Sequence, residues 1–284
     1  MRIGIDVGGT KIEGIALDDG GNEAGRVRVP TPRHDYAGTI AAVCGVIEQL
    51  ERHTGCRGTV GCGIPGTISS LTGRVKNANS TWLNGQPFQL DLENALGRPV
   101  RMANDANCFA LSETIDGAAA GAAVVFGVII GTGCGGGIVV HGQVLTGANA
   151  IAGEWGHNPL PDPRDDERPG PACYCGRCGC IETFLSGPGL SRDYAQATGR
   201  SLDAQAIVER ANQGEAEACA ALDRYENRLA RSLSVVVNIL DPDVIVLAGG
   251  LSNIDRLYRN VPGLIRPFGG EPLRTRIVKP RFGD

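Results

Sequence analysis

The sequence predicts an α/β protein in which helices cover doubly wound sheets in two domains. Apolar strand-like runs alternate with segments of helical spacing. In addition, a strand–glycine turn–strand unit opens each half, at residues 2–17 and 124–140. At 284 residues the chain is long for one domain. We therefore expect a small N-terminal α/β domain at residues 1–117 and a larger α/β domain at residues 118–284.

The first domain is predicted to begin with a glycine turn between two strands. Arg2 to Asp6 is a short apolar run, VGGTK is the turn, and Ile12 to Leu17 continues extended. Adjacent glycines let backbone N–H groups approach a phosphate closely, because they carry no Cβ atom. Asp6, at the end of the strand, could hold magnesium directly or through water. An ordinary hairpin turn is the alternative.

Helices and strands then alternate up to a carboxylate at a strand end. The pattern predicts a helix at 35–53, a strand at 59–64, a helix at 89–96 and a strand at 100–103. The last strand runs into NDANC, residues 104–108, before a helix at 107–115. Open α/β sheets place ligands at such strand ends, which makes Asp105 a candidate catalytic residue. Asp105 could instead cap the helix.

The second domain is expected to repeat the opening unit. Residues 124–130 form an apolar strand, GTGCGGG at 131–137 is the turn, and 138–140 continue extended. The repetition indicates an internal duplication. Two such turns facing each other could hold the phosphates of one nucleotide from both sides. Two unrelated hairpins remain the alternative, because glycine is abundant in this chain, with 42 residues.

The last third is predicted to be mainly helical. Residues 204–211 form a modest helix, and residues 215–240 form a long core helix whose charged side chains, including Arg228, face solvent. Residues 244–247 form a buried strand that ends in a third glycine turn, at Gly249 and Gly250.

Residues 154–182 contain side chains that suit a metal ion. His157, Cys173, Cys175 and Cys180 supply one imidazole and three thiolates, a soft set that suits tetrahedral zinc. Four protein ligands leave no place for water, so this zinc should be structural and should fold a loop with few apolar residues. Free thiols or disulfides are the alternative, but the spacing is a poor disulfide framework. Cys178 is a fifth candidate, but it lies between two glycines, where its thiol could point outward and remain free.

Composition and charge argue against several functions. The net charge is −4 and no basic run stands out, whereas a nucleic-acid partner needs a positive face. The sequence contains no apolar run of about 20 residues, the length that a membrane-spanning helix needs. Ten cysteines without an export signal indicate a reducing cytoplasm. The cysteines expected in the apolar core are Cys44, Cys62, Cys108 and Cys219.

Six motifs together resemble the ROK family of bacterial sugar kinases and repressors. They are DVGGTK (6–11), NDANC (104–108), IGTGCGGG (130–137), GEWGH (153–157), CYCGRCGCIETF (173–184) and DPDVIVLAGG (241–250). The resemblance covers essentially the whole chain. Within the family the chain is most similar to bacterial fructokinases of the manno(fructo)kinase type, through KNANSTWLNGQPF (76–88) and GEWGHNPLP (153–161).

This resemblance implies a two-domain actin-like ATPase fold, of the ribonuclease H-like type, with a zinc-stapled loop. It implies ATP-dependent phosphorylation of a hexose, with fructose expected, and Asp105 as the general base. The residues implied to bind the sugar are Gly66, Asn104, Asp105, Glu154, His157 and Glu182. The residues implied to surround magnesium-ATP are Gly4, Asp6, Gly8, Gly9, Thr10, Lys11, Gly131, Thr132, Gly133, Gly135, Gly249 and Gly250.

Several alternatives stay open within the resemblance. The substrate could be mannose, glucose or an N-acetylhexosamine. A sugar-sensing repressor is a different class, but repressors carry a DNA-binding helix-turn-helix ahead of the glycine turn, whereas here the first strand starts at Arg2. Family members usually continue past the final KPRFGD with a glycine-containing helix, whose loss would affect stability or activity. The family also favours a homodimer.

Overall fold

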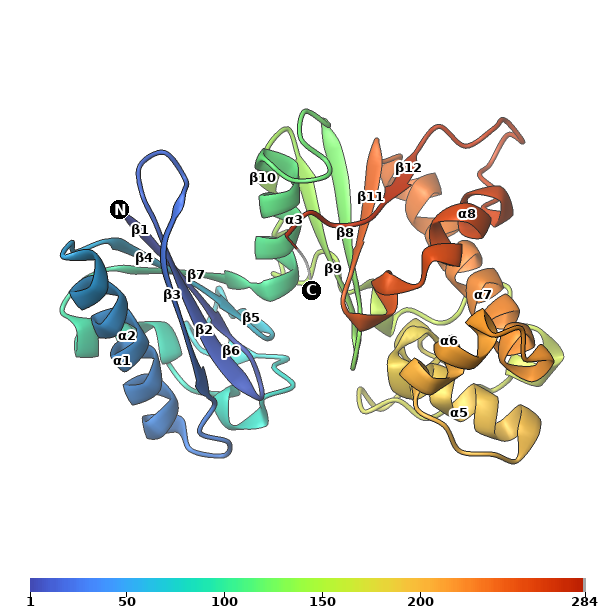
Figure 1. Cartoon of the computed structure of the whole chain (residues 1–284), viewed down its shortest axis with the longest axis horizontal. Coiled ribbons are helices and arrows are strands. Elements are labelled where there is room, and N and C mark those ends of the chain that lie inside the picture. Colours follow the sequence, from blue (N-terminus) through green and yellow to red (C-terminus); the bar gives the residue numbers. More distant parts are fainter. Residues whose placement is uncertain (283–284) are drawn as a thin grey trace. The chain divides into compact units, whose positions relative to one another are not determined.

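The computed structural model describes residues 1–282 and divides into two compact units (Figure 1). The first unit comprises Met1–Cys108 together with Thr146–Ile151, and the second comprises Phe109–Leu145 and the residues from Ala152 onward. The division falls inside helix α3 (Asp105–Ile115). The boundary expected from the sequence, at residue 117, lies beyond the end of that helix.

The first unit is built on a five-stranded sheet in the order β3-β2-β1-β4-β7. Its strands are β1 (Arg2–Val7), β2 (Lys11–Leu17), β3 (Glu23–Pro30), β4 (Thr59–Ile64) and β7 (Val100–Asn104). The first three pair antiparallel, whereas β1, β4 and β7 run parallel. The unit also contains β5 (Thr67–Ile68), β6 (Val75–Lys76), η1 (Thr81–Leu83), α1 (Tyr36–Thr54) and α2 (Phe88–Leu96).

Helix α1 forms where its sequence signals predict it. The Asp35 side chain accepts a hydrogen bond from the Gly38 amide and caps the first turn, and Gly55 ends the helix in the left-handed conformation. Its apolar stripe, which includes Val46 and Leu50, is buried against the sheet. The packing is close, because a Cβ atom at Gly14 of β2 would lie 2.4 Å from the Val46 side chain.

The second unit repeats the topology of the first. Its sheet has the order β10-β9-β8-β11-β12. The strands are β8 (Val124–Ile130), β9 (Cys134–Val140), β10 (Gln143–Val144), β11 (Val244–Ala248) and β12 (Arg276–Val278). Again the first three pair antiparallel, and β8, β11 and β12 run parallel. The duplication predicted from the glycine turns is therefore present in the fold.

Helices cover both faces of the second sheet (Figure 1). Val125 and Val246 point to the face that carries α3, whereas Phe126 and Leu247 point to the opposite face, against α7 (Ala216–Leu240) and α8 (Asp255–Leu264). The other helices of this unit are α4 (Ile181–Leu185), α5 (Gly187–Thr198), α6 (Ala204–Asn212), η2 (Trp155–His157), η3 (Asp165–Glu167) and η4 (Gly250–Asn253). The arrangement is the α/β fold predicted.

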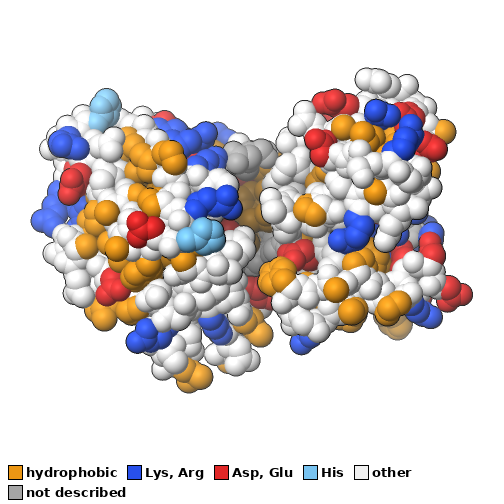
Figure 2. All heavy atoms as spheres, turned by 90° about the horizontal axis from the view of Figure 1, so that it is seen from below, with side chains coloured by type: hydrophobic (Ala, Val, Ile, Leu, Met, Phe, Trp, Pro, Cys, Tyr) orange, Lys and Arg blue, Asp and Glu red, His pale blue; other side chains and the backbone are white. Residues whose placement is uncertain are grey.

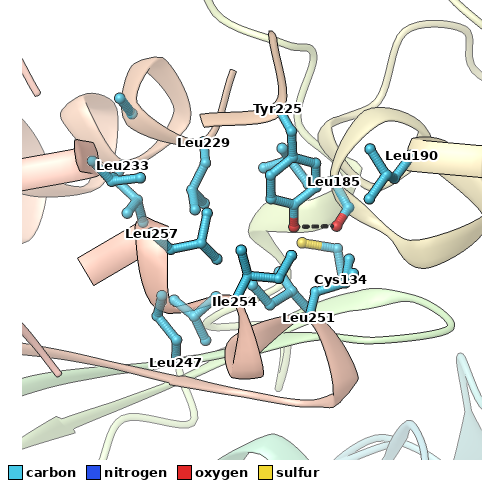
Figure 3. Close-up of a cluster of buried hydrophobic side chains, with 14 of the residues drawn as sticks. Cys134, Leu185, Leu190, Tyr225, Leu229, Leu233, Leu247, Leu251, Ile254 and Leu257 are labelled. Carbon is cyan, nitrogen blue, oxygen red and sulfur yellow. Dashed lines mark hydrogen bonds between the residues drawn. The ribbon is translucent and has the colours of Figure 1, made fainter. Parts of the chain in front are cut away.

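The main core of the second unit holds three separate segments together (Figure 3). Tyr225 of α7 is buried and donates a hydrogen bond to the Leu185 carbonyl of α4 at 2.8 Å. Cys134, the first residue of β9, and Leu251 of η4 pack into the same cluster. One core therefore holds the turn before β9, the turn after β11 and the end of the Cys/His loop, which is residues 154–182.

The glycine run at 131–137 is shorter as a turn than expected. Strand β9 begins at Cys134, which pairs with Ile130, so only residues 131–133 form the turn. The glycines in the strand allow close packing, because a Cβ atom at Gly136 would lie 2.9 Å from the Phe126 ring and 3.0 Å from Trp155.

Two expectations about burial are wrong. Arg228 is only 6% exposed, because Glu167 and Asp193 pair with it inside the second unit. Cys108 is exposed on the first turns of α3, whereas Cys62 is buried and Cys44 and Cys219 are partly buried. Apolar neighbours in the sequence therefore do not place Cys108 in the core.

The surface shown in Figure 2 carries acidic and basic side chains interspersed with apolar ones. Among the described residues, none of the helices combines the length and apolar character that a bilayer crossing requires.

Candidate active site and metal centre

Four predicted metal ligands converge in the second unit. One ligand atom from each of His157, Cys173, Cys175 and Cys180 lies within 4.8 Å of the others. The Cys173 sulfur is 3.5 Å from Nδ1 of His157, and the sulfurs of Cys175 and Cys180 are 3.6 Å apart. Cys178 is exposed and does not join the cluster.

These separations fit a tetrahedral zinc site. Zn–S bonds of about 2.3 Å and a Zn–N bond of about 2.0 Å place two sulfurs about 3.8 Å apart and a sulfur about 3.5 Å from the nitrogen. Burial raises the pKa of the Cys173 thiol and raises that of Cys180 to about 12. Zinc binds cysteine as the thiolate, and a coordinated divalent cation deprotonates the thiol. The donor set thus suits zinc as the bound ion.

Trp155 anchors the segment that carries Glu154 and His157. Its indole Nε1 donates to the Gly135 carbonyl at 2.8 Å, and its ring meets Phe126 edge-on at 5.7 Å. The flanking glycines rest on the backbone of β9, where a Cβ atom at Gly156 would lie 2.0 Å from the Cys134 carbonyl oxygen. The GEWGH motif therefore packs its backbone closely against that of β9. This packing fixes the segment that carries Glu154 and His157.

The second ring nitrogen of His157 already has a neighbour. Its Nε2 lies 2.9 Å from the hydroxyl of Tyr174, and the two rings are perpendicular, 5.1 Å apart. Tyr174 is 76% exposed. A sugar hydroxyl at Nε2, as the resemblance implies, would take the place of the Tyr174 hydroxyl. Sequence reasoning missed Tyr174, although its position between two metal ligands was a usable signal.

Glu182 connects the Cys/His loop to the glycine turn of the second sheet. Glu182 lies in α4, two residues after Cys180, and its Oε2 accepts a hydrogen bond from the Cys134 amide at 2.9 Å. A Cβ atom at Gly133 would lie 2.8 Å from the same oxygen. The glycine is thus needed for the carboxylate to reach the turn.

Two glycine turns meet at the carboxyl edge of the second sheet. Strands β8 and β11 are parallel neighbours, so the turns that follow them lie together. A Cβ atom placed on Gly131 would lie 4.0 Å from the Cα atom of Gly249 and 4.0 Å from the backbone nitrogen of Gly250. The Gly187 amide, at the start of α5, donates to the Gly131 carbonyl at 2.7 Å. The Gly189 amide donates to the Ser186 hydroxyl at 3.2 Å, so the first amides of α5 already have acceptors within the protein.

A cavity of about 830 Å³ opens beside these turns. Gly131, Thr132 and Gly250 line it, together with residues from the starts of α5 and α6 such as Asp203 and Gln205. Its size is that of a cofactor site. The α6 residues carry no recognisable motif, so sequence reasoning missed them.

The carboxyl edge of the first sheet gathers the other predicted residues. Asp6 pairs with Gly63 and Ile64 pairs with Asn104, so the ends of β1, β4 and β7 lie side by side. Gly66 follows β4 with φ 73°, and a Cβ atom there would lie 2.4 Å from the Lys76 carbonyl oxygen. Its own carbonyl accepts a hydrogen bond from Asn104 Nδ2 at 2.9 Å.

Asn104, the residue before Asp105, caps α3. Oδ1 of Asn104 accepts a hydrogen bond from the Asn107 amide three residues later, at 3.2 Å. Oδ1 of Asp105 accepts a hydrogen bond from the adjacent Ala106 amide at 2.8 Å. The cap is therefore supplied by the asparagine.

The turn after β1 is held from β3. Thr31 donates its hydroxyl to the Gly8 carbonyl at 2.7 Å and its amide to the Thr10 carbonyl at 3.0 Å. Lys11 lies 3.7 Å from Glu13. Two predicted nucleotide-binding glycines sit inside strands: Gly4 in the middle of β1 and Gly135 in β9. The turn itself therefore consists of Gly8, Gly9 and Thr10.

The chain is similar along its whole length to known proteins. The profile of the ROK family matches residues 2–283. The N-acetyl-D-glucosamine kinase of Pectobacterium atrosepticum is 39% identical over 292 residues, which cover 100% of this chain and 95% of that protein. A ROK hexokinase from Thermus thermophilus has a similar structure (TM-score 0.83, 32% identity, 99% of this chain and 93% of that chain). So has a ROK family glucokinase from Streptomyces griseus in complex with glucose and AMPPNP (TM-score 0.80, 25% identity, 99% and 95%).

Proposed function

Because the chain belongs to the ROK family and is a sugar kinase, we propose that it phosphorylates N-acetyl-D-glucosamine with ATP as the donor. The observation that carries the proposal is the 39% identity to an N-acetyl-D-glucosamine kinase over the whole chain. The fructose preference expected from the sequence is not supported by these relatives, and the N-acetyl-D-glucosamine kinase favours the N-acetylhexosamine alternative. The Streptomyces griseus relative, solved with AMPPNP, supports an adenine nucleotide as donor.

We assign Asp105 as the general base. Phosphoryl transfer needs a positioned nucleophile and one group to take its proton. Asp105 directly follows β7, at the carboxyl edge where open α/β sheets place ligands, and Asn104 supplies a cap for α3. The proton of the attacking sugar hydroxyl would pass to this carboxylate. Asn104, held by the Gly66 carbonyl, would contact a neighbouring sugar hydroxyl.

In the second unit, Glu154, His157 and Glu182 are proposed to bind sugar hydroxyls. Carboxylates form strong charge-assisted hydrogen bonds with hydroxyl groups. A zinc ion on His157 and the three thiols would be structural, because four protein ligands complete its coordination. Its chemical contribution would be to hold the segments on which the two acids are mounted.

The nucleotide is proposed to use the glycine turns. Thr132 and Gly250 belong to the two turns and line the cavity, and we expect their backbone amides to contact phosphate oxygens. The cavity beside them has room for the nucleoside. In the first unit, Asp6 would hold a magnesium ion and the Gly9 amide would contact the phosphates it binds, whereas the Gly8 amide donates to the Lys11 carbonyl at 3.0 Å. Magnesium would neutralise phosphate charge in this reaction.

A turnover panel tests the substrate. ADP release is measured with N-acetyl-D-glucosamine, N-acetyl-D-mannosamine, glucose, mannose and fructose at matched concentrations. We expect the highest kcat/KM with N-acetyl-D-glucosamine. Faster turnover of fructose would restore the first expectation and overturn this one, and faster turnover of glucose would assign a glucokinase.

A further inference from the structure

A second cavity in the second unit has no part in the proposed reaction. It measures about 680 Å³ and is walled by residues 166–171 of the Cys/His loop and by side chains of α4, α5 and α7. Among the described residues that line it, none belongs to the glycine turns or to the proposed sugar ligands. Its size matches that of small-molecule sites.

Positive charge exceeds negative charge around this cavity. Four arginines line it, Arg168, Arg192, Arg224 and Arg228, against three acids, Asp166, Glu167 and Asp193. Asp193 is shared by Arg224 and Arg228, each at 2.7 Å. Glu167 is shared by Arg228 at 2.7 Å and by Arg231 at 2.8 Å. Two carboxylates therefore serve three guanidinium groups.

Arg192 adds a further cation to this wall. Its guanidinium is partly buried and donates to the Thr183 carbonyl oxygen. Within residues 1–282 it makes no ion pair with a carboxylate, and burial lowers its pKa. A guanidinium has five N–H donors in a planar fork that matches phosphate oxygens. Most of the donors of Arg192 are therefore available for a ligand.

We propose that this cavity binds a small phosphate ester. The phosphate dianion would be held by Arg192 and by Arg168 at the rim, with donors of Arg224 that Asp193 does not use. Phe184 and Pro169 provide an apolar wall for the organic part of the ligand. The wall has a fixed shape, because Arg228 stacks on the Phe184 ring at 5.2 Å.

The cavity is connected to the Cys/His loop through α4. Arg192 holds the Thr183 carbonyl, and the Thr183 hydroxyl donates to the carbonyl of Cys180 at 2.7 Å. Glu182 is the residue before Thr183. A ligand on Arg192 would therefore change the position of Glu182 and, through it, the affinity for sugar. The effect on sugar affinity rests on the proposed role of Glu182.

The test is a calorimetric titration of the full-length protein with glucose 6-phosphate and, separately, with inorganic phosphate. Saturating N-acetyl-D-glucosamine and AMPPNP are present so that the proposed active site is filled. We expect the ester to bind, Arg192→Met to weaken binding at least ten-fold, and Arg200→Met, an exposed arginine that follows α5, to leave it unchanged. Inorganic phosphate binding as tightly as the ester would show an ion site and overturn the ester proposal. Absence of binding, or equal binding by Arg192→Met, would reject the site.

A second variant and a second readout keep the test decisive. If Arg192→Met does not fold, Arg168→Met replaces it, because Arg168 is exposed and its ion pair, with exposed Asp165, is 3.6 Å long. Unchanged ester binding by Arg168→Met then rejects the site. Hydrogen exchange of residues 180–185 should slow on ester binding even if another sugar proves to be the substrate. This result separates failure of the cavity from failure of the proposed function.

Discussion

Oε2 of Glu182 accepts a hydrogen bond from the Cys134 amide at 2.9 Å. One partner follows the Cys/His loop, and the other begins the strand after the Gly131–Gly133 turn. The side proposed for the sugar and the turn proposed for phosphate are thus connected by a single carboxylate. Because the bond is charge-assisted, it should be stronger than one between neutral groups.

This connection predicts different kinetics for two acids of the loop. Glu182→Gln should raise the KM for sugar roughly 10- to 100-fold, as expected for losing a hydrogen bond to a charged group. It should also raise the KM for ATP, because a neutral amide oxygen holds the Cys134 amide less strongly than the carboxylate does. Glu154→Gln should raise the KM for sugar alone. Steady-state kinetics with each substrate varied in turn compares the two variants, and an unchanged KM for ATP in Glu182→Gln would contradict the connection.

A second prediction concerns the different roles of Asn104, which caps α3, and Asp105, the proposed general base. Asp105→Asn should lower kcat by about 10²–10⁴-fold, the usual contribution of a general base, while sugar binding survives. Asn104→Ala should lower the free energy of unfolding by about 1 kcal/mol, because it removes a helix cap. Turnover, calorimetric sugar binding and urea denaturation are measured on both variants. Normal kcat in Asp105→Asn would remove it from the base role.

Local sequence patterns were sufficient for most of the fold. Helix α1 has a capping aspartate, an apolar stripe and a closing glycine within one segment, and its bounds were predicted to within a residue or two. The Cys/His cluster was also predictable, because three of its ligands lie within eight positions and share a soft chemistry. Duplication was visible from the two glycine turns that open the sheets.

Long-range pairs explain what the sequence did not predict. Arg228 looked solvent-exposed on the helical pattern, but its partners Glu167 and Asp193 lie 61 and 35 positions away. The bond between Glu182 and Cys134 spans 48 positions. No periodicity reports such pairs, because they depend on how distant elements pack. The cavity beside α6 was missed for the same reason.

Zinc removal supplies a third prediction. Purified protein should contain about one zinc ion per chain. Cys180→Ser should lose the metal and increase hydrogen exchange at residues 159–180, because this loop depends on the ion to fold. Cys178→Ser, an exposed cysteine in the same loop, is the matched control and should retain zinc. Metal analysis of both variants decides, and full zinc occupancy in Cys180→Ser would refute the ligand set.

Glu167 predicts how stability depends on pH. It is 5% exposed; burial acts to raise its pKa, but hydrogen bonds from Arg228, the Arg164 amide and Arg231 outweigh burial and lower the pKa overall. Its stabilisation is therefore complete above the ordinary carboxyl pKa of about 4.3 and is lost as pH falls through the lower folded value. Near pH 7, Glu167→Gln should cost about 3–5 kcal/mol, because it leaves buried arginines uncompensated.

The measurement is urea denaturation of wild type and Glu167→Gln across this pH range. The difference in unfolding free energy should shrink once the pH falls below about 4.3. Asp165→Asn, in the same turn but fully exposed, should have little effect at any pH. A difference that does not change with pH would show that Glu167 is not held as a carboxylate by the arginines.

The last prediction concerns Glu113, a buried residue of α3 that binds the backbone amides of Arg281 and Phe282. Glu113 is 0% exposed; its Oε1 accepts from the Phe282 amide at 2.7 Å, and its Oε2 accepts from the Ala118 amide at 2.8 Å. Glu113→Gln would turn an N–H donor toward one of these amides, so we expect the free energy of unfolding to fall by about 1–3 kcal/mol. Asp116→Asn, an exposed acid just beyond the helix, should change it by less than about 0.5 kcal/mol. Urea denaturation near neutral pH compares the two, and equal stability of both variants would mean that the amides do not depend on a carboxylate.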